Sequence, residues 1–306
     1  MNDITNNNPL FCDPEAGVCG IPDRSEATAI APQHSEKQVK VIYFTDPICS
    51  SCWGIEPQLR KMKLEYGKNI ELEYRMGGLL PDWSYNSGGI SKPSDVGPHW
   101  DEVSLHYDMP IDGDVWMEDP LHSSYPPSIA FKAAQLQDTG KAILFLREMR
   151  EMLFLQKKNI TRWEHLAIAA QNAGLDVDQL KADFEGGAKT LFEEDLKLAK
   201  EYGVRGFPTM FFVSASGDQE TVYGSRPYPF YETAILKLAP NASKAEYDRD
   251  WRSLFTKFRS LTAKEFSELS GTRRSESEGI LDELASTGEL EKLTTKNGSL
   301  WLRKLN

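Results

Sequence analysis

The sequence predicts an α/β protein that ends in a small α+β module. Residues 39–76 change from a strand-like to a helix-like pattern and back, which is typical of a strand–helix–strand unit with parallel strands. Residues 261–305 read instead as two short helices followed by two alternating segments around a turn, which favours a helix–helix–hairpin unit. A chain of 306 residues is long enough for two such units.

The first predicted strand leads directly into a pair of cysteines. Residues 39–45 are rich in β-branched and aromatic side chains, and Asp46-Pro47 ends the run. Cys49 and Cys52 follow where a helical pattern begins. Free amide groups and the helix dipole favour an anion there, so we expect the pKa of Cys49 to be lowered and its thiolate to be nucleophilic. Cys52, one turn further on, is placed to resolve a mixed disulfide.

The first 38 residues are polar and rich in turn formers, so residues 1–38 are expected to be an irregular lead-in segment. They contain a second cysteine pair, Cys12 and Cys19. This pair is either two buried thiols in a loop or a possible second dithiol that exchanges with Cys49 and Cys52. A zinc site made from all four cysteines is disfavoured, because a strand-to-helix junction is a poor setting for a structural metal. We expect no metal and no cofactor.

Residues 77–126 contain many glycines and prolines and are expected to be rich in loops. Three tryptophans fall in this region, Trp83, Trp100 and Trp116. They either form a binding surface or anchor the loops to the core.

Apolar residues at helical spacing predict several helices between residues 127 and 203. We therefore expect a helical insertion, about 90–186, inside the α/β domain.

A second informative motif, Gly206-Phe207-Pro208-Thr209, runs into another predicted strand. Proline at the start of a strand is tolerated at an edge or with an unusual bond geometry. A cis Phe207–Pro208 bond would place the backbone of Phe207 beside the dithiol, where its N–H and C=O could pair with an extended substrate.

With these two motifs the sequence resembles the DsbA-like branch of the thioredoxin superfamily, over roughly residues 38–240. The long insertion and the N-terminus resemble, more narrowly, the cytosolic FrnE/YjbH-like group. The resemblance implies a thioredoxin-like domain in residues 39–240 and a protein-disulfide oxidoreductase or isomerase acting on a disulfide- or thiol-containing protein substrate. The implied site residues are the catalytic Cys49, Cys52 and Pro208, with Pro208 in cis, and the substrate-binding Phe207, Thr209 and Trp53.

The resemblance also leaves a function of another class open. YjbH-like proteins use this fold to present a partner to a protease, which would make the chain an adaptor without turnover. The related kappa glutathione transferases and hydroxychromene carboxylate isomerases activate glutathione with a serine, and the intact cysteine pair argues against that activity.

Residues 241–306 are predicted to form a winged-helix-like domain, with a hairpin around Lys296-Asn297-Gly298. Its second helix, residues 275–286, has four carboxylates and no basic residue, and the whole chain carries a net charge of −11. Phosphate contacts require Lys and Arg, so we expect this domain to bind a protein partner rather than DNA.

No apolar run approaches the ~18 residues of a membrane span. Residues 1–8 lack the pattern of a signal peptide. We therefore expect no membrane association and a cytoplasmic location.

Overall fold

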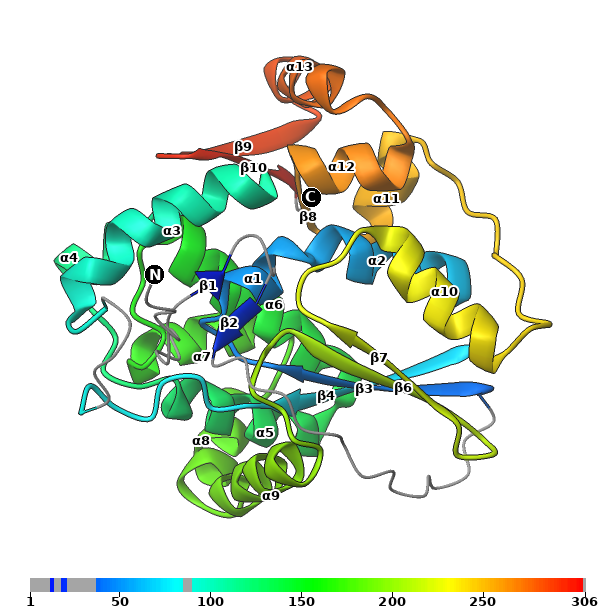
Figure 1. Cartoon of the computed structure of the whole chain (residues 1–306). Coiled ribbons are helices and arrows are strands. Elements are labelled where there is room, and N and C mark those ends of the chain that lie inside the picture. Colours follow the sequence, from blue (N-terminus) through cyan, green and yellow to red (C-terminus); the bar gives the residue numbers. More distant parts are fainter. Residues whose placement is uncertain (1–11, 14–17, 21–36, 85–89, 305–306) are drawn as a thin grey trace, which may run out of the picture.

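The computed structural model describes residues 12–13, 18–20, 37–84 and 90–304. Its centre is a four-stranded sheet with the order β4–β3–β6–β7 (Figure 1). The strands are β3 (Val39–Thr45), β4 (Ile70–Met76), β6 (Thr209–Ser214) and β7 (Gln219–Tyr223). β3 pairs in parallel with β4 and antiparallel with β6, so the predicted parallel strand–helix–strand unit is confirmed.

Helices cover both faces of this sheet (Figure 1). α2 (Glu56–Tyr66) and α10 (Tyr228–Leu238) lie on one face, and α5 (Tyr125–Gln137) and α9 (Ala188–Glu201) lie on the other. Every residue of β6 is buried, as expected for a strand covered on both sides. The short helix α1 (Ser50–Gly54) follows β3 and leads into α2.

The segment between β4 and α9 is mostly helical. Besides α5 it contains α3 (Pro93–Tyr107), α4 (Val115–Glu118), α6 (Thr139–Gln156), α7 (Trp163–Asn172) and α8 (Val177–Glu185). Residues 77–126, expected to be rich in loops, also contain α3, which begins at Pro93 and has Pro98 in its interior. Proline suits the first helical position, whose N–H has no intrahelical acceptor. Proline content therefore concealed this helix.

The tryptophans of that region anchor it to the core. Trp100 and Trp116 are buried and lie edge to face, with ring centroids 5.1 Å apart. Trp83 is half-buried and donates its indole N–H to the carbonyl of Leu121 at 2.8 Å. The anchor interpretation is therefore favoured over an exposed aromatic binding surface.

The C-terminal module consists of α11 (Trp251–Lys257), β8 (Ser260–Thr262), α12 (Ala263–Ser270), α13 (Arg274–Ser286), β9 (Leu290–Thr295) and β10 (Gly298–Arg303). β10 pairs antiparallel with both β9 and β8, so the predicted hairpin is extended by a third strand. A capping box between Thr262 and Glu265 starts α12. Leu261, Phe266 and Trp301 belong to a hydrophobic cluster of the module's own.

The module is attached to the helices of the α/β core through a buried ion-pair cluster, which we call the junction cluster. Its members are Arg60, Arg147, Arg150, Glu56, Glu151 and Glu265. Arg147 donates two hydrogen bonds to Glu265, at 2.8 and 3.0 Å, and its Nε lies 2.6 Å from Glu151. Since Glu265 belongs to α12 and Arg147 to α6, these bonds join the two parts.

A second, smaller sheet contains strands from the N-terminal segment. β1 (Cys12–Asp13) pairs with β2 (Val18–Gly20), and β2 pairs with β5 (Gly206–Phe207). The segment predicted to be irregular therefore includes a hairpin, and the rest of residues 1–36 lies outside the described residues. No helix within the described ranges is both long and apolar enough to cross a membrane.

Candidate functional site

Cys49 is the N-cap residue of α1, as the strand-to-helix pattern predicted. The backbone N–H of Cys52 donates to the Cys49 sulfur at 3.1 Å. The preceding turn is closed by the carboxylate of Asp46, which accepts the backbone N–H of Ile48 at 3.0 Å. Both cysteines are free thiols and 0% exposed.

The lowered pKa expected for Cys49 is not what the structure gives. Burial raises the pKa of the Cys49 thiol well above its usual value, and the amide of Cys52 and the charge of Arg150 do not offset the loss of hydration. Against the same effect of burial, the hydrogen bond with Cys49 and the charge of Arg150 lower the pKa of Cys52 instead, so within the pair a thiolate is favoured at Cys52 rather than at Cys49. The sequence pattern located the helix start but carried no information about how completely the surrounding chain encloses the sulfur.

A buried arginine lies behind the loop that carries Cys49, and the sequence pattern missed it. Arg150 of α6 is 0% exposed and donates to the Thr45 hydroxyl at 2.7 Å and to the Asp46 carbonyl at 3.2 Å. It also pairs with Glu56 at 2.6 Å. Arg150 therefore ties the end of β3 to α6 and α2. Its place in a helical run that also contains Arg147, Glu148 and Glu151 gave no signal of this role.

Asp46 is a second residue whose role the sequence did not reveal. Its carboxylate is buried and accepts hydrogen bonds from Leu79 N–H at 2.7 Å and from the Ser124 hydroxyl at 2.9 Å. Despite these donors, burial raises the pKa of Asp46 to about 6. Asp46 thus links the loop before Cys49 to the start of the helical insertion.

Carbon-13 NMR of the side-chain carboxyl groups should show Asp46 titrating at about pH 6. An aspartate in the unfolded chain titrates near ~3.9. Between these values the folded state keeps a proton that the unfolded state releases, so this group lowers stability as pH rises through that window. Asp82, whose pKa is lowered by hydrogen bonds from Ser84, serves as the internal control. A midpoint for Asp46 at or below ~4 would contradict the prediction.

Two of the predicted substrate-binding residues lie in the core. Trp53 is 0% exposed, donates its indole N–H to the Pro110 carbonyl at 3.0 Å and stacks on Phe154. Thr209 is 2% exposed and donates its hydroxyl to the Gly206 carbonyl at 2.7 Å. These positions place both side chains against the protein interior rather than at a substrate surface.

The Phe207–Pro208 bond is cis, as the resemblance implied. The strand edge that was expected to receive a substrate, however, is occupied by the chain itself. In the antiparallel ladder between β5 and β2, Phe207 is opposite Cys19 and Gly206 is opposite Gly20. The ring of Phe207 rests on Gly77, where a Cβ atom would come within 1.9 Å of it.

The register of β1 and β2 places the backbones of Cys12 and Cys19 directly opposite each other. Their side chains lie outside what the structure describes, so a second dithiol stays a prediction. In the part of the chain that the structure describes, no cluster of three or more His, Cys, Asp or Glu side chains is arranged to hold a metal ion.

Comparison with known proteins agrees with this fold. A profile of the thioredoxin family matches residues 43–233. A putative protein disulfide isomerase from Nitrosomonas europaea superposes with a TM-score of 0.56 at 20% identity, covering 67% of this chain and 97% of that one. The cytosolic disulfide reductase DsbM from Pseudomonas aeruginosa gives a TM-score of 0.54 at 19% identity, covering 66% and 99%. At these identities the likeness concerns the fold, and the predicted DsbA-like thioredoxin fold is confirmed.

Relatives of higher identity cover nearly the whole chain. The ClpXP adapter protein SpxH of Halalkalibacterium halodurans is 33% identical over 301 residues, which are 96% of this chain and 97% of the relative. The proteins of the same name from Bacillus subtilis and Shouchella clausii are 30% and 36% identical, covering 88% and 72% of this chain and 90% and 71% of their own.

The prediction that this chain is a protein-disulfide oxidoreductase is therefore wrong. The relatives that share most of its length are named adapter proteins, not enzymes, and the disulfide-exchange proteins resemble it at 19–20% identity only. The comparisons favour the adaptor alternative. The thioredoxin profile spans more than half of the chain, and one relative is 33% identical over 96% of it. This chain belongs to the thioredoxin family and to the same family as the SpxH adapter proteins.

Proposed function

We propose that this protein is a cytoplasmic adaptor that holds a partner protein for degradation by the ClpXP protease. The observation that carries the proposal is the enclosure of the cysteine pair: Cys49 and Cys52 are both 0% exposed. Disulfide exchange requires a thiolate that can reach the substrate's sulfur. Burial opposes ionisation of Cys49, and β2 covers the strand edge beside it. A fold that encloses its cysteine pair in this way is suited to binding a partner protein and not to exchanging disulfides with it.

The charge pattern of the C-terminal module supports a protein partner over DNA. Arg274 pairs with Asp108 at 2.6 Å, Lys292 pairs with Asp282 at 2.6 Å, and Lys296 pairs with Asp101 at 2.6 Å. These basic residues lie near the second helix and the hairpin, where a DNA-binding module would use them for phosphate. Because carboxylates already pair with these three side chains, their positive charge is less available to a duplex.

Protein turnover in cells tests this proposal. Pulse labelling with quantitative mass spectrometry should identify a protein whose half-life lengthens equally in a strain without this chain and in a strain without ClpX. Adding the purified chain to purified ClpXP and that protein should then accelerate its degradation. If no protein is stabilised in both strains, the adaptor proposal is wrong.

Replacing both Cys49 and Cys52 with serine should leave delivery of the partner unchanged. Serine is similar in size, and the proposed role needs binding and not sulfur chemistry. The measurement is the rate of partner degradation by ClpXP in the presence of each form of the chain. A double variant that folds like the parent but abolishes delivery would show that the dithiol takes part in the function.

A further inference from the structure

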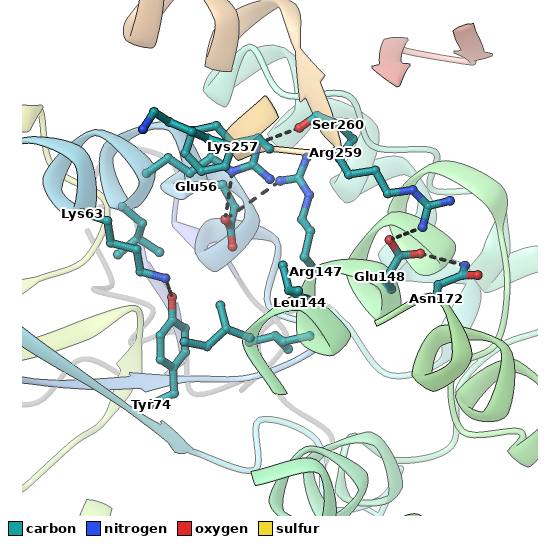
Figure 2. A pocket seen from close by; sticks show the side chains of 15 residues that line it. Glu56, Lys63, Tyr74, Leu144, Arg147, Glu148, Asn172, Lys257, Arg259 and Ser260 are labelled. Carbon is teal, nitrogen blue, oxygen red and sulfur yellow. Dashed lines mark hydrogen bonds and ion pairs between the residues drawn. The ribbon is translucent and has the colours of Figure 1, made fainter. Parts of the chain in front are cut away.

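A cavity lies between the α/β core and the C-terminal module (Figure 2). Its volume is about 220 Å³, and it is bounded by α2, α6 and the segment 257–260 that joins α11 to β8. Leu59 and Phe258 contribute apolar surface, and Leu144, which also lines the cavity, is 56% exposed. A water molecule occupies roughly 30 Å³, so this space is large enough for a bulky apolar side chain.

Cationic side chains outnumber carboxylates in the lining. The cations are Arg60, Lys63, Arg147, Lys257 and Arg259, and the carboxylates are Glu56 and Glu148. The chain as a whole has the opposite balance, with 46 acidic and 35 basic residues. The residues that line the cavity therefore carry a net positive charge, whereas the whole chain is net negative.

Two of these cations are available to a ligand. Arg60 and Arg147 pair with the carboxylates of the junction cluster, and Arg259 pairs with Glu148 at 3.1 Å (Figure 2). Lys63, by contrast, donates to the hydroxyl of Tyr74, at 2.9 Å, and pairs with no carboxylate among the described residues. Lys257 is exposed and forms no ion pair with any described residue. The cavity thus combines an apolar interior with two uncompensated lysines.

We propose that this cavity binds a segment of the partner protein in which a large apolar side chain is flanked by carboxylates. The apolar side chain would fill the cavity, and the carboxylates would pair with Lys63 and Lys257. Lys63 belongs to α2 and Lys257 is the last residue of α11, so one bound segment would contact both parts of the chain. This inference rests on the proposed adaptor function and identifies the chemistry of the partner.

A direct binding assay tests the site. The probe is a fluorescein-labelled peptide with a central leucine between pairs of glutamates, and its fluorescence anisotropy is measured against the full-length chain. Changing Lys63→Glu and Lys257→Glu together should weaken binding by about 10-fold, the loss expected for two surface ion pairs. Replacing the peptide's leucine with serine should weaken binding by at least about 10-fold, because the cavity is then left unfilled.

The matched control is Lys189→Glu with Lys197→Glu, which makes the same change in net charge on the exposed face of α9. It should leave the peptide affinity unchanged. An equal loss in both double variants would show a general effect of net charge and would overturn the proposal. Unchanged binding in the cavity variant would also overturn it. Lys257→Glu alone, at an exposed position, provides a variant with little risk to folding.

Two further outcomes are informative. If the serine peptide binds as well as the leucine peptide and inorganic phosphate displaces both, the cavity is a simple anion site and the proposal is wrong. The peptide assay contains no protease, so it separates this inference from the adaptor function. If the chain does not bind the peptide but delivers its partner protein to ClpXP normally, the cavity site is wrong and the adaptor function stands. If the chain binds the peptide normally but no form of it delivers a partner protein, the adaptor function is wrong and the cavity site stands.

Discussion

Replacing Glu265 with glutamine is expected to lower the free energy of unfolding by about 3–5 kcal/mol. The junction cluster contains three guanidinium groups and three carboxylates, and the side chain of Glu265 is fully buried within it. Removing this carboxylate leaves three buried guanidinium groups with two carboxylates, Glu56 and Glu151, so one buried positive charge is no longer compensated. The measurement is equilibrium unfolding in urea, followed by tryptophan fluorescence.

Glu268→Gln is the matched control for this prediction. Glu268 lies on the same helix, α12, and is partly exposed beside Lys61 and Lys264. Loss of such a surface pair should cost no more than ~1 kcal/mol. Equal effects of the two substitutions would show that the junction cluster does not hold the module to the core.

The effect of Glu265 should depend on pH. Burial alone would raise the pKa of Glu265, but the charges of Arg147 and Arg60 outweigh it and lower the pKa below its usual value. The stabilisation by this carboxylate is therefore complete above the unfolded value of about 4.3 and is lost as pH falls through the folded value. The stability difference between the parent and Glu265→Gln should shrink on acidification. A difference that stays constant down to acid unfolding would contradict this account.

Asp195→Asn is expected to lower the free energy of unfolding by a similar amount, about 3–5 kcal/mol. Asp195 of α9 is 0% exposed and accepts from Arg75 at 2.8 Å and from the Met76 N–H at 2.9 Å. It also pairs at 2.9 Å with Lys132, whose side chain is 7% exposed. Arg75 retains its pair with Glu73 in the variant, whereas Lys132 is left as a buried charge without a carboxylate partner among the described residues.

A second substitution distinguishes whether the loss of stability in Asp195→Asn comes from the unpaired charge or from altered packing. Lys132→Met combined with Asp195→Asn removes both charges, and asparagine still offers an oxygen to the Met76 N–H. The double variant should recover most of the lost stability, to within about 1 kcal/mol of the parent. Glu194→Gln, at an exposed neighbouring position on α9, should change stability by less than ~0.5 kcal/mol. A double variant as unstable as Asp195→Asn would show that the loss comes from packing.

Features predicted from local patterns are confirmed most closely. The strand before Cys49, the helix start at Cys49 and the hairpin between β9 and β10 all follow from residue types a few positions apart. In residues 77–126, which were expected to be rich in loops, prolines at the start and inside of α3 obscured the helical pattern.

The surroundings of the predicted site residues could not be predicted from the sequence. Cys49 is enclosed by segments distant in sequence, and the edge beside Phe207 is taken by β2. No pattern around position 49 indicates that burial will raise the pKa of its thiol. The enzymatic interpretation relied on the motif alone, and motif spacing does not report solvent access.

The sequence alone determined the strand that leads to the cysteine pair, the helix start at Cys49 and the C-terminal hairpin, because each depends on residues close together in the chain. The thioredoxin-like class followed from the resemblance of two motifs to a known family. Tertiary structure alone decided burial and pairing. Arg150 meets Glu56 across 94 positions of the chain, and Arg147 meets Glu265 across 118. Desolvation and charge pairing depend on which distant segments meet in space. Because such segments enclose Cys49 and Cys52, the cysteine pair is part of a closed core.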